Sequence, residues 1–306
     1  MSVINNKLTV VYIQGYGRSG STLLDTILHQ EKNSYSVGAL NNIFKWSTEG
    51  QLCACGMELC QCDFWSQIDQ IKNVDLSEVN HYQDLQSGFE KFSNYKKLIK
   101  GESSYQEEYK NLQEKIFFDI SNISNKTIII DSSKSTRDCT GRAFALHQYT
   151  DINVKIIHLV RDVRGVCWST IKKTGSNERR RFTDNKFINT VRAALSWWLT
   201  NKMSLKTTAM LPAGSVITVR YEDLCDSPAR ELSRIGDFLQ LDYSSVVEKV
   251  LNGEELDVSH NLGGNQIRFN RALKFKPDLE WRKRMPKIYR FISMLIAVRL
   301  NNFFGY

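Results

Sequence analysis

The sequence predicts an α/β fold, a three-layer sandwich in which helices flank a central, mostly parallel sheet. Short runs rich in β-branched residues recur along the chain, as is typical of strands buried on both faces. These runs are residues 8–14, 127–131, 154–162 and 215–224. Helical patterns lie between or after them, at 22–29, 184–209 and 229–240. This alternation favours right-handed crossovers, so we expect ligands to bind at the carboxyl ends of the strands.

The segment 66–120 interrupts the alternation. It is rich in Gln, Ser, Lys, Tyr and Glu and contains no strong strand pattern, so we expect inserted amphipathic helices. The chain shows no repeat, low-complexity tract or clear linker. We therefore expect residues 1–306 to form a single domain that carries this helical insertion.

The charge balance favours an anionic ligand. Lys and Arg number 41 against 33 Asp and Glu, which gives a formal net charge of +8. Such an excess fits a nucleotide, a sulfated product, nucleic acid or a membrane surface, or else a merely basic soluble surface. No recognised nucleic-acid-binding module occurs in the sequence, so nucleic acid is not an expected partner.

The apolar segments are short. The first residues lack a basic region followed by a long apolar core, and the apolar run at 291–298 is far shorter than the roughly 20 residues that span a bilayer. A cytoplasmic protein without a membrane span is the expectation. Its seven cysteines then suit reduced thiols or metal ligands better than a disulfide framework.

A glycine-rich turn, "GYGRSGST", follows the first expected strand. Gly15, Gly20 and Thr22 match most of the pattern GxxxxGK[ST], but Ser21 takes the place of the lysine. Backbone N–H groups of such a turn and the start of the next helix can hold an anion. Arg18 supplies a full charge and can contact two oxygens of a phosphate or sulfate. The alternative is an ordinary tight turn with a solvated arginine.

A second motif, "HLVRDVRGVCWSTIKK", occupies residues 158–173. Arg161 is expected at the carboxyl end of a strand, and Ser169 lies about two helical turns further on. A charge and a hydroxyl can therefore meet on one phosphate. A surface ion pair of small energetic value is the alternative.

Taken together, the two motifs resemble the sulfotransferase family, whose members move a sulfuryl group from 3′-phosphoadenosine 5′-phosphosulfate (PAPS) to an acceptor. The first resembles the family's 5′-phosphosulfate loop and the second its 3′-phosphate segment. The resemblance, to a bacterial and Golgi-type subset, implies a P-loop-like fold. It also implies PAPS as the donor, adenosine 3′,5′-bisphosphate as the product, and transfer that requires no metal.

Three further stretches agree with this family. "IIIDSSKSTR" resembles a segment in which the lysine, here Lys134, reaches the transferring sulfate, so Arg18 and Lys134 are the expected catalytic residues. "HNLGGNQIRF" resembles the late loop that closes over the nucleotide. In "VRYEDL", residues 221–223 are interpreted as structural. The donor-binding residues that the resemblance implies are Gly17, Arg18, Ser19, Gly20, Ser21, Thr22, Arg161, Ser169, Gly264, Asn265 and Arg268.

The general base is unassigned. Related families place a glutamate about twenty residues beyond the loop, but the matching stretch "YSVGALNN" has Ala39 there. The base comes from elsewhere, or the acceptor is an amine or other group that needs less help, or the chain is a weakened form. His29 lies too far along its helix, and His158 is interpreted as a histidine of the strand core.

Four cysteines cluster in "CACGMELCQC". Cys53, Cys55, Cys60 and Cys62 could bind zinc, but the commoner structural spacing is CxxC twice with a longer loop between the pairs. A cysteine-rich turn followed by "DFW" also resembles the same subset of sulfotransferases. The favoured interpretation is a structural turn without metal, and zinc is the alternative. The basic stretch 172–182 is either a solvated loop or a flap over the ligand.

The expected function is transfer of a sulfuryl group from PAPS to a hydroxyl or amine of a small molecule. The polar insertion favours a soluble metabolite or natural product, with a carbohydrate or a lipid headgroup as alternatives. One rival is a P-loop kinase or NTPase with Asp131 as a magnesium ligand, although the loop lacks its lysine. The other is a non-catalytic nucleotide binder that has lost its base.

Overall fold

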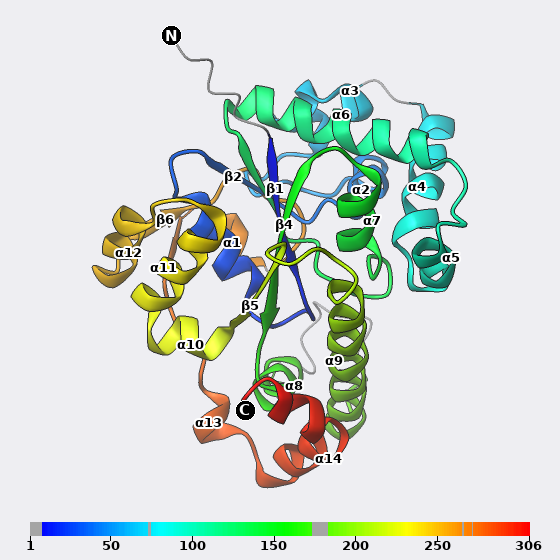
Figure 1. Ribbon diagram of the computed structural model, residues 1–306. Coiled ribbons are helices and arrows are strands. Elements are labelled where there is room, and N and C mark those ends of the chain that lie inside the picture. The colour runs from blue at the N-terminus through cyan, green and yellow to red at the C-terminus, as the bar shows by residue number, and fades with distance from the viewer. Residues whose placement is uncertain (1–7, 73–74, 173–182, 265, 271) are drawn as a thin grey trace.

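The computed structural model describes residues 8–72, 75–172, 183–264, 266–270 and 272–306. Its centre is a sheet of five parallel strands in the order β2-β3-β1-β4-β5 (Figure 1). The strands are β1 (Thr9–Gln14), β2 (Ser34–Gly38), β3 (Ile128–Asp131), β4 (Asn153–Val160) and β5 (Val216–Arg220). The predicted α/β class and parallel sheet are confirmed. The fourth predicted strand ends at Arg220, because residues 221–226 form a helix.

The strand β2 was missing from the sequence prediction. Its residues, "SYSVG", contain two serines and a glycine and no apolar run. The fold satisfies these polar groups individually, since the Ser36 hydroxyl donates to the Asn261 amide oxygen at 2.7 Å. A strand that depends on such distant partners has no local pattern by which to recognise it.

The two faces of the sheet bury separate hydrophobic clusters. Along β1, Val10 and Tyr12 belong to one cluster, whereas Val11 and Ile13 belong to the other, and all four are fully buried. The first face is covered by α4 (Leu76–Glu90), α6 (Gln106–Ser124) and α7 (Arg142–Tyr149). The second is covered by α1 (Ser21–His29), α11 (Pro228–Leu239) and α12 (Ser244–Leu251). Burial of each large apolar side chain contributes about 1.5–3 kcal/mol.

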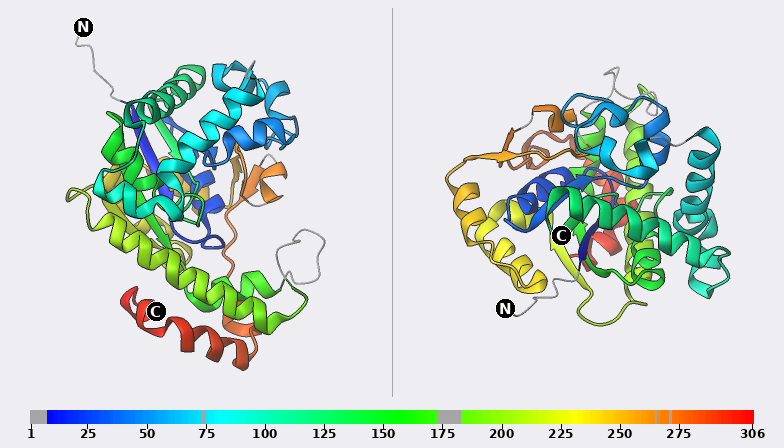
Figure 2. Two further views of the ribbon diagram at one scale, coloured as in Figure 1. Left: turned by 90° about the vertical axis from the view of Figure 1, so that its right-hand side faces the viewer. Right: turned by 90° about the horizontal axis from the view of Figure 1, so that it is seen from above.

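A third cluster joins helices beyond the carboxyl ends of the strands, where α14 (Lys287–Phe303) packs against α8 (Val163–Ile171) and α9 (Lys186–Thr208) (Figure 2). The shorter helices are α2 (Ile43–Thr48), α3 (Asp69–Lys72), α5 (Tyr95–Lys100), α10 (Tyr221–Asp226) and α13 (Trp281–Arg284). Short 3-10 turns are η1 (Leu59–Gln61), η2 (Trp65–Gln67), η3 (Phe92–Asn94) and η4 (Gln266–Asn270), and β6 (Glu255–Asp257) pairs antiparallel with β7 (Ala272–Lys274). Within the described parts of the chain, no helix is both long and apolar enough to cross a membrane.

A buried arginine joins the helices that follow β2 to the sheet. Arg142, only 1% exposed, donates from Nε to Asp131 at 2.9 Å and from Nη1 to Glu90 and to Gln113. Burial raises the pKa of Glu90 to about 7, and the charge of Arg142 opposes that rise. One guanidinium therefore holds two carboxyl groups, one from the sheet and one from α4.

Candidate functional site

The loop between β1 and α1 can form only with glycine at two positions. Gly15 has φ 127°, and a Cβ there would lie 2.3 Å from the Leu159 carbonyl oxygen of β4. Gly20 has φ 94°, and a Cβ there would meet the Tyr221 ring at 2.3 Å. Both glycines permit a backbone conformation and a close approach that other residues would obstruct. The loop lies beside the point where the sheet extends from β1 in both directions, a usual ligand position.

A cavity of about 440 Å³ lies against this loop. Its walls come from segments just beyond the carboxyl ends of β1, β3, β4 and β5, and from the late segment 264–278. The lining residues are Gly17, Arg18, Gly20, Ser21, Thr22, Leu23, Lys134, Arg161, Ser169, Tyr221, Gly264, Leu273, Lys274, Lys276 and Asp278. Cations outnumber the single acid, so the cavity favours an anionic ligand.

The structure brings most of the predicted site residues together in this cavity. Those on its walls are Gly17, Arg18, Gly20, Ser21, Thr22, Lys134, Arg161, Ser169 and Gly264. Ser19 and Arg268 are buried and are not on the cavity walls, although the charge of Arg268 adds to burial in lowering the pKa of Lys134. Arg268 contacts the Leu52 carbonyl oxygen at 3.4 Å and lies over the Phe269 ring, because η4 directs its side chain toward the cysteine-rich segment. Asn265 and the basic stretch at 173–182 lie outside the described residues.

Arg161 is fixed in place before any ligand arrives. Only 3% exposed, it follows β4 directly, and its Nη1 donates to the Arg18 carbonyl oxygen at 3.1 Å. Its guanidinium lies 4.5 Å from the centre of the Tyr221 ring and pairs with Asp278 at 3.6 Å. Among the described residues its Nε has no hydrogen-bond partner. The Arg161 side chain lines the cavity, so its fixed charge is suited to an incoming anion.

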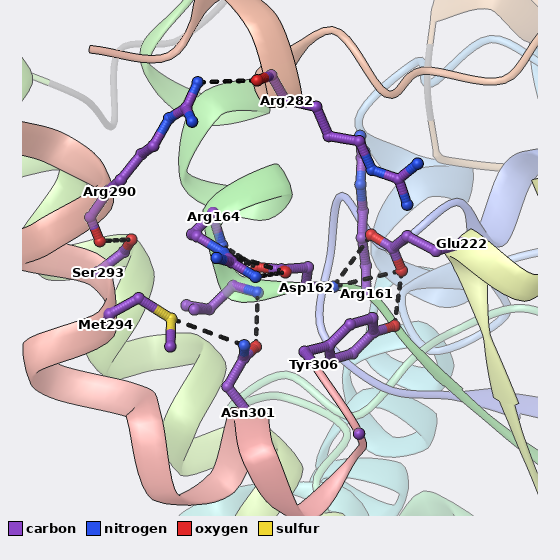
Figure 3. Close-up of polar contacts among 12 residues, drawn as sticks. Arg161, Asp162, Arg164, Glu222, Arg282, Arg290, Ser293, Met294, Asn301 and Tyr306 are labelled. Carbon is purple, nitrogen blue, oxygen red and sulfur yellow. Dashed lines mark hydrogen bonds and ion pairs between the residues drawn. The ribbon is translucent and has the colours of Figure 1, made fainter. Parts of the chain in front are cut away.

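A network behind Arg161 supports this position (Figure 3). The Asp162 amide donates to Glu222 at 3.3 Å, and the Tyr306 hydroxyl donates to the same carboxylate at 2.6 Å. Arg164, the second arginine of the RDxR motif, pairs with Asp162 and is absent from the cavity wall. The two arginines of the motif therefore have different roles: Arg161 lines the cavity, and Arg164 holds Asp162 in the network behind it.

Tyr221 corrects the interpretation of its segment as purely structural. Glu222 has the expected supporting role, but Tyr221 lines the cavity, with its ring against Arg161 and Gly20. Its hydroxyl oxygen accepts a hydrogen bond from the Asp278 amide at 2.9 Å. Since β5 ends one residue earlier, Tyr221 stands at a strand's carboxyl end like the other site residues.

Lys134 approaches the cavity from the far side of β1. It has φ 73°, a conformation rare for residues other than glycine, as has Arg18. Its amide donates to the Ile13 carbonyl oxygen at 3.2 Å, and its Nζ donates to the Ser132 carbonyl oxygen at 3.2 Å. Burial lowers the pKa of Lys134. A poorly solvated ammonium group interacts strongly with an anion placed beside it.

Asp25 is a chemically notable residue that the sequence analysis missed. It lies on α1, is 1% exposed, and accepts a hydrogen bond from the Asn261 side chain at 2.8 Å. Burial raises its pKa to about 7, while Ser36 and the charge of Lys134 act in the opposite direction. The available signal was a lone acid within the apolar stretch "TLLDTIL".

The remaining candidates for a base are unsuitable. Ala39 directly follows β2, is 5% exposed, and donates its amide to the Leu262 carbonyl oxygen at 2.8 Å. His158 is a buried core residue, as predicted, and burial lowers its pKa to about 4. His29 pairs with Asp257 at 3.4 Å and accepts from the Ser36 amide. None of the three lines the cavity, and neither does Asp25, but Asp25 is an acid with a raised pKa on which the charge of Lys134 acts.

Two lysines of the segment 264–278 also line the cavity but were not predicted from the sequence. Lys274 ends β7, and Lys276 follows two residues later, so the extended backbone places both on the side that faces the cavity. The alternation in "KFKPD" was the signal that could have identified them.

Comparisons with known proteins agree with this geometry. The family model described as "Sulfotransferase family" matches residues 11–245. The sulfotransferase domain of the Synechococcus PCC 7002 olefin synthase is 20% identical over 98% of this chain and 96% of its own, with a TM-score of 0.53.

Two other solved structures share the fold. The sulfotransferase domain from the curacin biosynthetic pathway is 21% identical over 96% of this chain and 97% of its own, with a TM-score of 0.52. Mouse sulfotransferase SULT7A1, solved in complex with PAP, is 10% identical over 97% of this chain and 89% of its own, with a TM-score of 0.51. No curated protein matches the sequence.

Proposed function

This chain belongs to the sulfotransferase family, and from that premise we propose that its cavity binds PAPS and passes the sulfuryl group to a hydroxyl or amine of a small molecule. One observation carries the proposal: a single cavity joins two groups of anion-binding residues. The first consists of the loop 17–22 with Lys134, and the second of Arg161 with Ser169. A donor with a 5′-phosphosulfate and a 3′-phosphate requires two such groups.

The loop and Lys134 form the reacting end in this proposal. When the acceptor attacks sulfur in line, negative charge builds on the oxygen that bridges sulfur and phosphorus. Donors fixed around that oxygen stabilise the transition state more than the ground state. Arg18 and Lys134 supply positive charge there, and the first turn of α1 supplies backbone N–H groups.

We assign the 3′-phosphate to the other end of the cavity. Arg161 supplies a fixed guanidinium to the cavity wall, and Ser169 lies on α8, 7% exposed and also on the wall. A guanidinium and a hydroxyl together match the donors that a phosphate dianion accepts. Lys274 and Lys276 then lie along the side of the nucleotide.

We propose Asp25 as the general base that the sequence analysis left unassigned. A base works best when its pKa is near the working pH, and burial raises the pKa of Asp25 to about 7. The charge of Lys134 acts on Asp25, which places the carboxylate near that lysine, although Asp25 itself is not on the cavity wall. This assignment explains how the chain can dispense with a glutamate at position 39.

The burial of Asp131 counts against one rival function, the kinase, but not against the other, a non-catalytic nucleotide binder. A magnesium-dependent kinase would need Asp131, but that carboxylate is fully buried and accepts hydrogen bonds from Arg142 and Ser133. A non-catalytic nucleotide binder has the same cavity and is separated from an enzyme only by assay. We further propose a single domain, since the sequence shows no clear linker, and a cytoplasmic location. The polar helical insertion favours a soluble metabolite or natural product as the acceptor.

Calorimetry distinguishes the proposed donor site from a nucleotide triphosphate site. Adenosine 3′,5′-bisphosphate should bind at least about tenfold more tightly than ATP with magnesium, a difference of about 1.4 kcal/mol. Tighter binding of ATP with magnesium contradicts the proposed donor. Transfer of radioactive sulfate from PAPS to a panel of alcohols and amines then separates an enzyme from a non-catalytic binder.

Replacing Ala39 with glutamate tests whether the chain has merely lost its base. Because Asp25 is assigned that role, Ala39→Glu should not raise the turnover of sulfuryl transfer. The new carboxyl group would also lie where the native side chain is 5% exposed, so the free energy of unfolding should fall by about 1–3 kcal/mol. Turnover and urea unfolding are the measurements, with Ala39→Gln as the uncharged control. A large rise in turnover with glutamate alone would mean that position 39 normally holds the base.

A further inference from the structure

Four potential metal ligands converge outside the cavity. The Sγ atom of Cys62 lies 3.6 Å from that of Cys55 and 3.0 Å from Nδ1 of His260. The Sγ atom of Cys53 lies 3.6 Å from the same nitrogen. All four ligand atoms lie within 4.8 Å of one another. The residues come from two parts of the chain that are about 200 positions apart.

These separations are close to the edges of a zinc tetrahedron. With Zn–S bonds of about 2.3 Å and Zn–N bonds of about 2.0 Å, ligand atoms around one ion lie about 3.5–3.8 Å apart. Three of the separations are 3.0 or 3.6 Å and all lie within 4.8 Å, so the ligands need to move by at most about 1 Å to form a tetrahedron. A disulfide would instead require a sulfur separation near 2.05 Å.

The local fold turns three of the cysteines inward and one outward. Leu52 pairs with Glu58 across a tight turn, in which the Cys53 amide donates to the Met57 carbonyl oxygen at 2.8 Å. This turn and η1 direct Cys53, Cys55 and Cys62 to the common centre. Cys60, within η1, is exposed and does not belong to the group.

His260 is held in the position that a fixed ligand requires. The Trp65 indole donates to its carbonyl oxygen at 2.7 Å. The Phe64 ring stacks on its imidazole, with centroids 5.5 Å apart and planes inclined by 16°. The Ala54 amide also donates to the carbonyl oxygen of Asn261 at 3.1 Å, which joins the two segments directly.

We propose that Cys53, Cys55, Cys62 and His260 bind one Zn²⁺ ion in a closed structural site. Three thiolates and one imidazole complete a tetrahedron and leave no position for substrate, as is typical of structural zinc. Binding forms three Zn–S bonds and one Zn–N bond, and the three thiols release their protons to solvent. The sequence pattern favoured a structural turn without metal, with Cys60 as a ligand in the zinc alternative, whereas this geometry replaces Cys60 with His260.

The ion would join the cysteine-rich segment to a wall of the proposed active site. Residues adjoining His260 contact that site, since Asn261 donates to Asp25 and Gly264 lines the cavity. Zinc is therefore expected to stabilise the late segment without taking part in transfer. This role does not depend on the identity of the donor or acceptor.

Metal analysis of protein purified without a metal-affinity tag tests the site. Wild-type protein expressed with zinc should contain about one zinc per chain, and so should the matched control Cys60→Ser. Cys62→Ser and His260→Ala should retain less than about a tenth of that amount. Wild-type protein that neither contains zinc nor takes it up after reduction overturns the proposal. Loss of zinc from Cys60→Ser overturns the ligand set.

Cobalt substitution provides a readout if a ligand variant fails to fold. Wild-type protein and Cys60→Ser, loaded with Co²⁺ under reducing conditions, should give the same visible bands of a tetrahedral thiolate site. His260→Cys should keep one ion per chain and strengthen the sulfur-to-cobalt absorption. Octahedral spectra, or a loss of thiolate absorption in Cys60→Ser, would overturn the assignment. Affinity for adenosine 3′,5′-bisphosphate, measured separately, keeps this result distinct from a failure of the proposed donor site.

Discussion

Asp25→Asn is expected to lower the turnover of sulfuryl transfer roughly 10²- to 10⁴-fold, the usual contribution of a general base. The amide has the shape of the carboxylate and can still accept from Asn261, but it cannot take a proton from the acceptor. In wild-type protein, turnover should rise with pH to a plateau, with an apparent pKa of about 7. The variant should lack that limb.

The measurement is turnover between pH 5 and 9 for both proteins, at a saturating concentration of PAPS. Affinity for adenosine 3′,5′-bisphosphate serves as the control for folding. It should change less than about threefold, since the substitution removes no residue that is proposed to contact the nucleotide. A variant that keeps most of its turnover and the same pH limb would remove Asp25 from the mechanism.

The same substitution should alter how stability depends on pH. The pKa of Asp25 is raised above its ordinary value of 3.8, so the folded state binds this proton more tightly than the unfolded state. Its contribution is therefore present below about pH 4, falls as pH rises, and is lost above about pH 7. Glu90, with a pKa also raised to about 7, contributes in the same direction. Asp25→Asn should therefore reduce this slope of unfolding free energy against pH without abolishing it.

Arg161→Ala is expected to weaken the binding of adenosine 3′,5′-bisphosphate by about 1.5–3 kcal/mol, or roughly 10- to 150-fold. Arg161 is the fixed cation at the end of the cavity that we assign to the 3′-phosphate. Adenosine 5′-phosphate lacks that group, so its affinity should change much less. The specificity of the effect for one ligand distinguishes a lost contact from a general disturbance of the cavity.

The motif itself supplies a matched control for this experiment. Arg164 pairs with the buried Asp162 away from the cavity, so Arg164→Ala should lower stability but change the ratio of the two ligand affinities less than about threefold. Calorimetry with both ligands on both variants provides the comparison. Equal losses for the two ligands in Arg161→Ala would contradict the assignment of Arg161 to the 3′-phosphate.

The strands and the turns beside them could be predicted because each depends on residues that are neighbours in the sequence. Four strands have apolar runs, Gly15 and Arg161 directly follow strands, and Gly20 directly precedes α1 in a turn that the sequence itself shows. The carboxyl ends of parallel strands share one edge of the sheet, so these residues could be expected to meet. The cavity with Arg18 and Lys134 on its wall agrees with that expectation.

What the sequence could not reveal depends on partners distant in the chain. The strand β2 relies on Asn261, and the pKa of Asp25 depends on burial that no local pattern records. His260 reaches Cys62 across 198 positions, whereas Cys60, adjacent in sequence, turns to solvent. Arg268 lies in the predicted loop, but its side chain contacts the Leu52 carbonyl oxygen and is not on the cavity wall.

The left-handed backbone conformation of Arg18 and Lys134 lowers the stability of the fold at two residues that are proposed to be catalytic. Each residue other than glycine loses about 1–2 kcal/mol in that conformation, and here both of the cations proposed to act on the sulfuryl group adopt it. Selection for thermal tolerance alone would favour glycine at positions 18 and 134. Such a protein would be more robust but would lack its proposed catalytic charges, so these two sites are the wrong places to seek stabilising mutations.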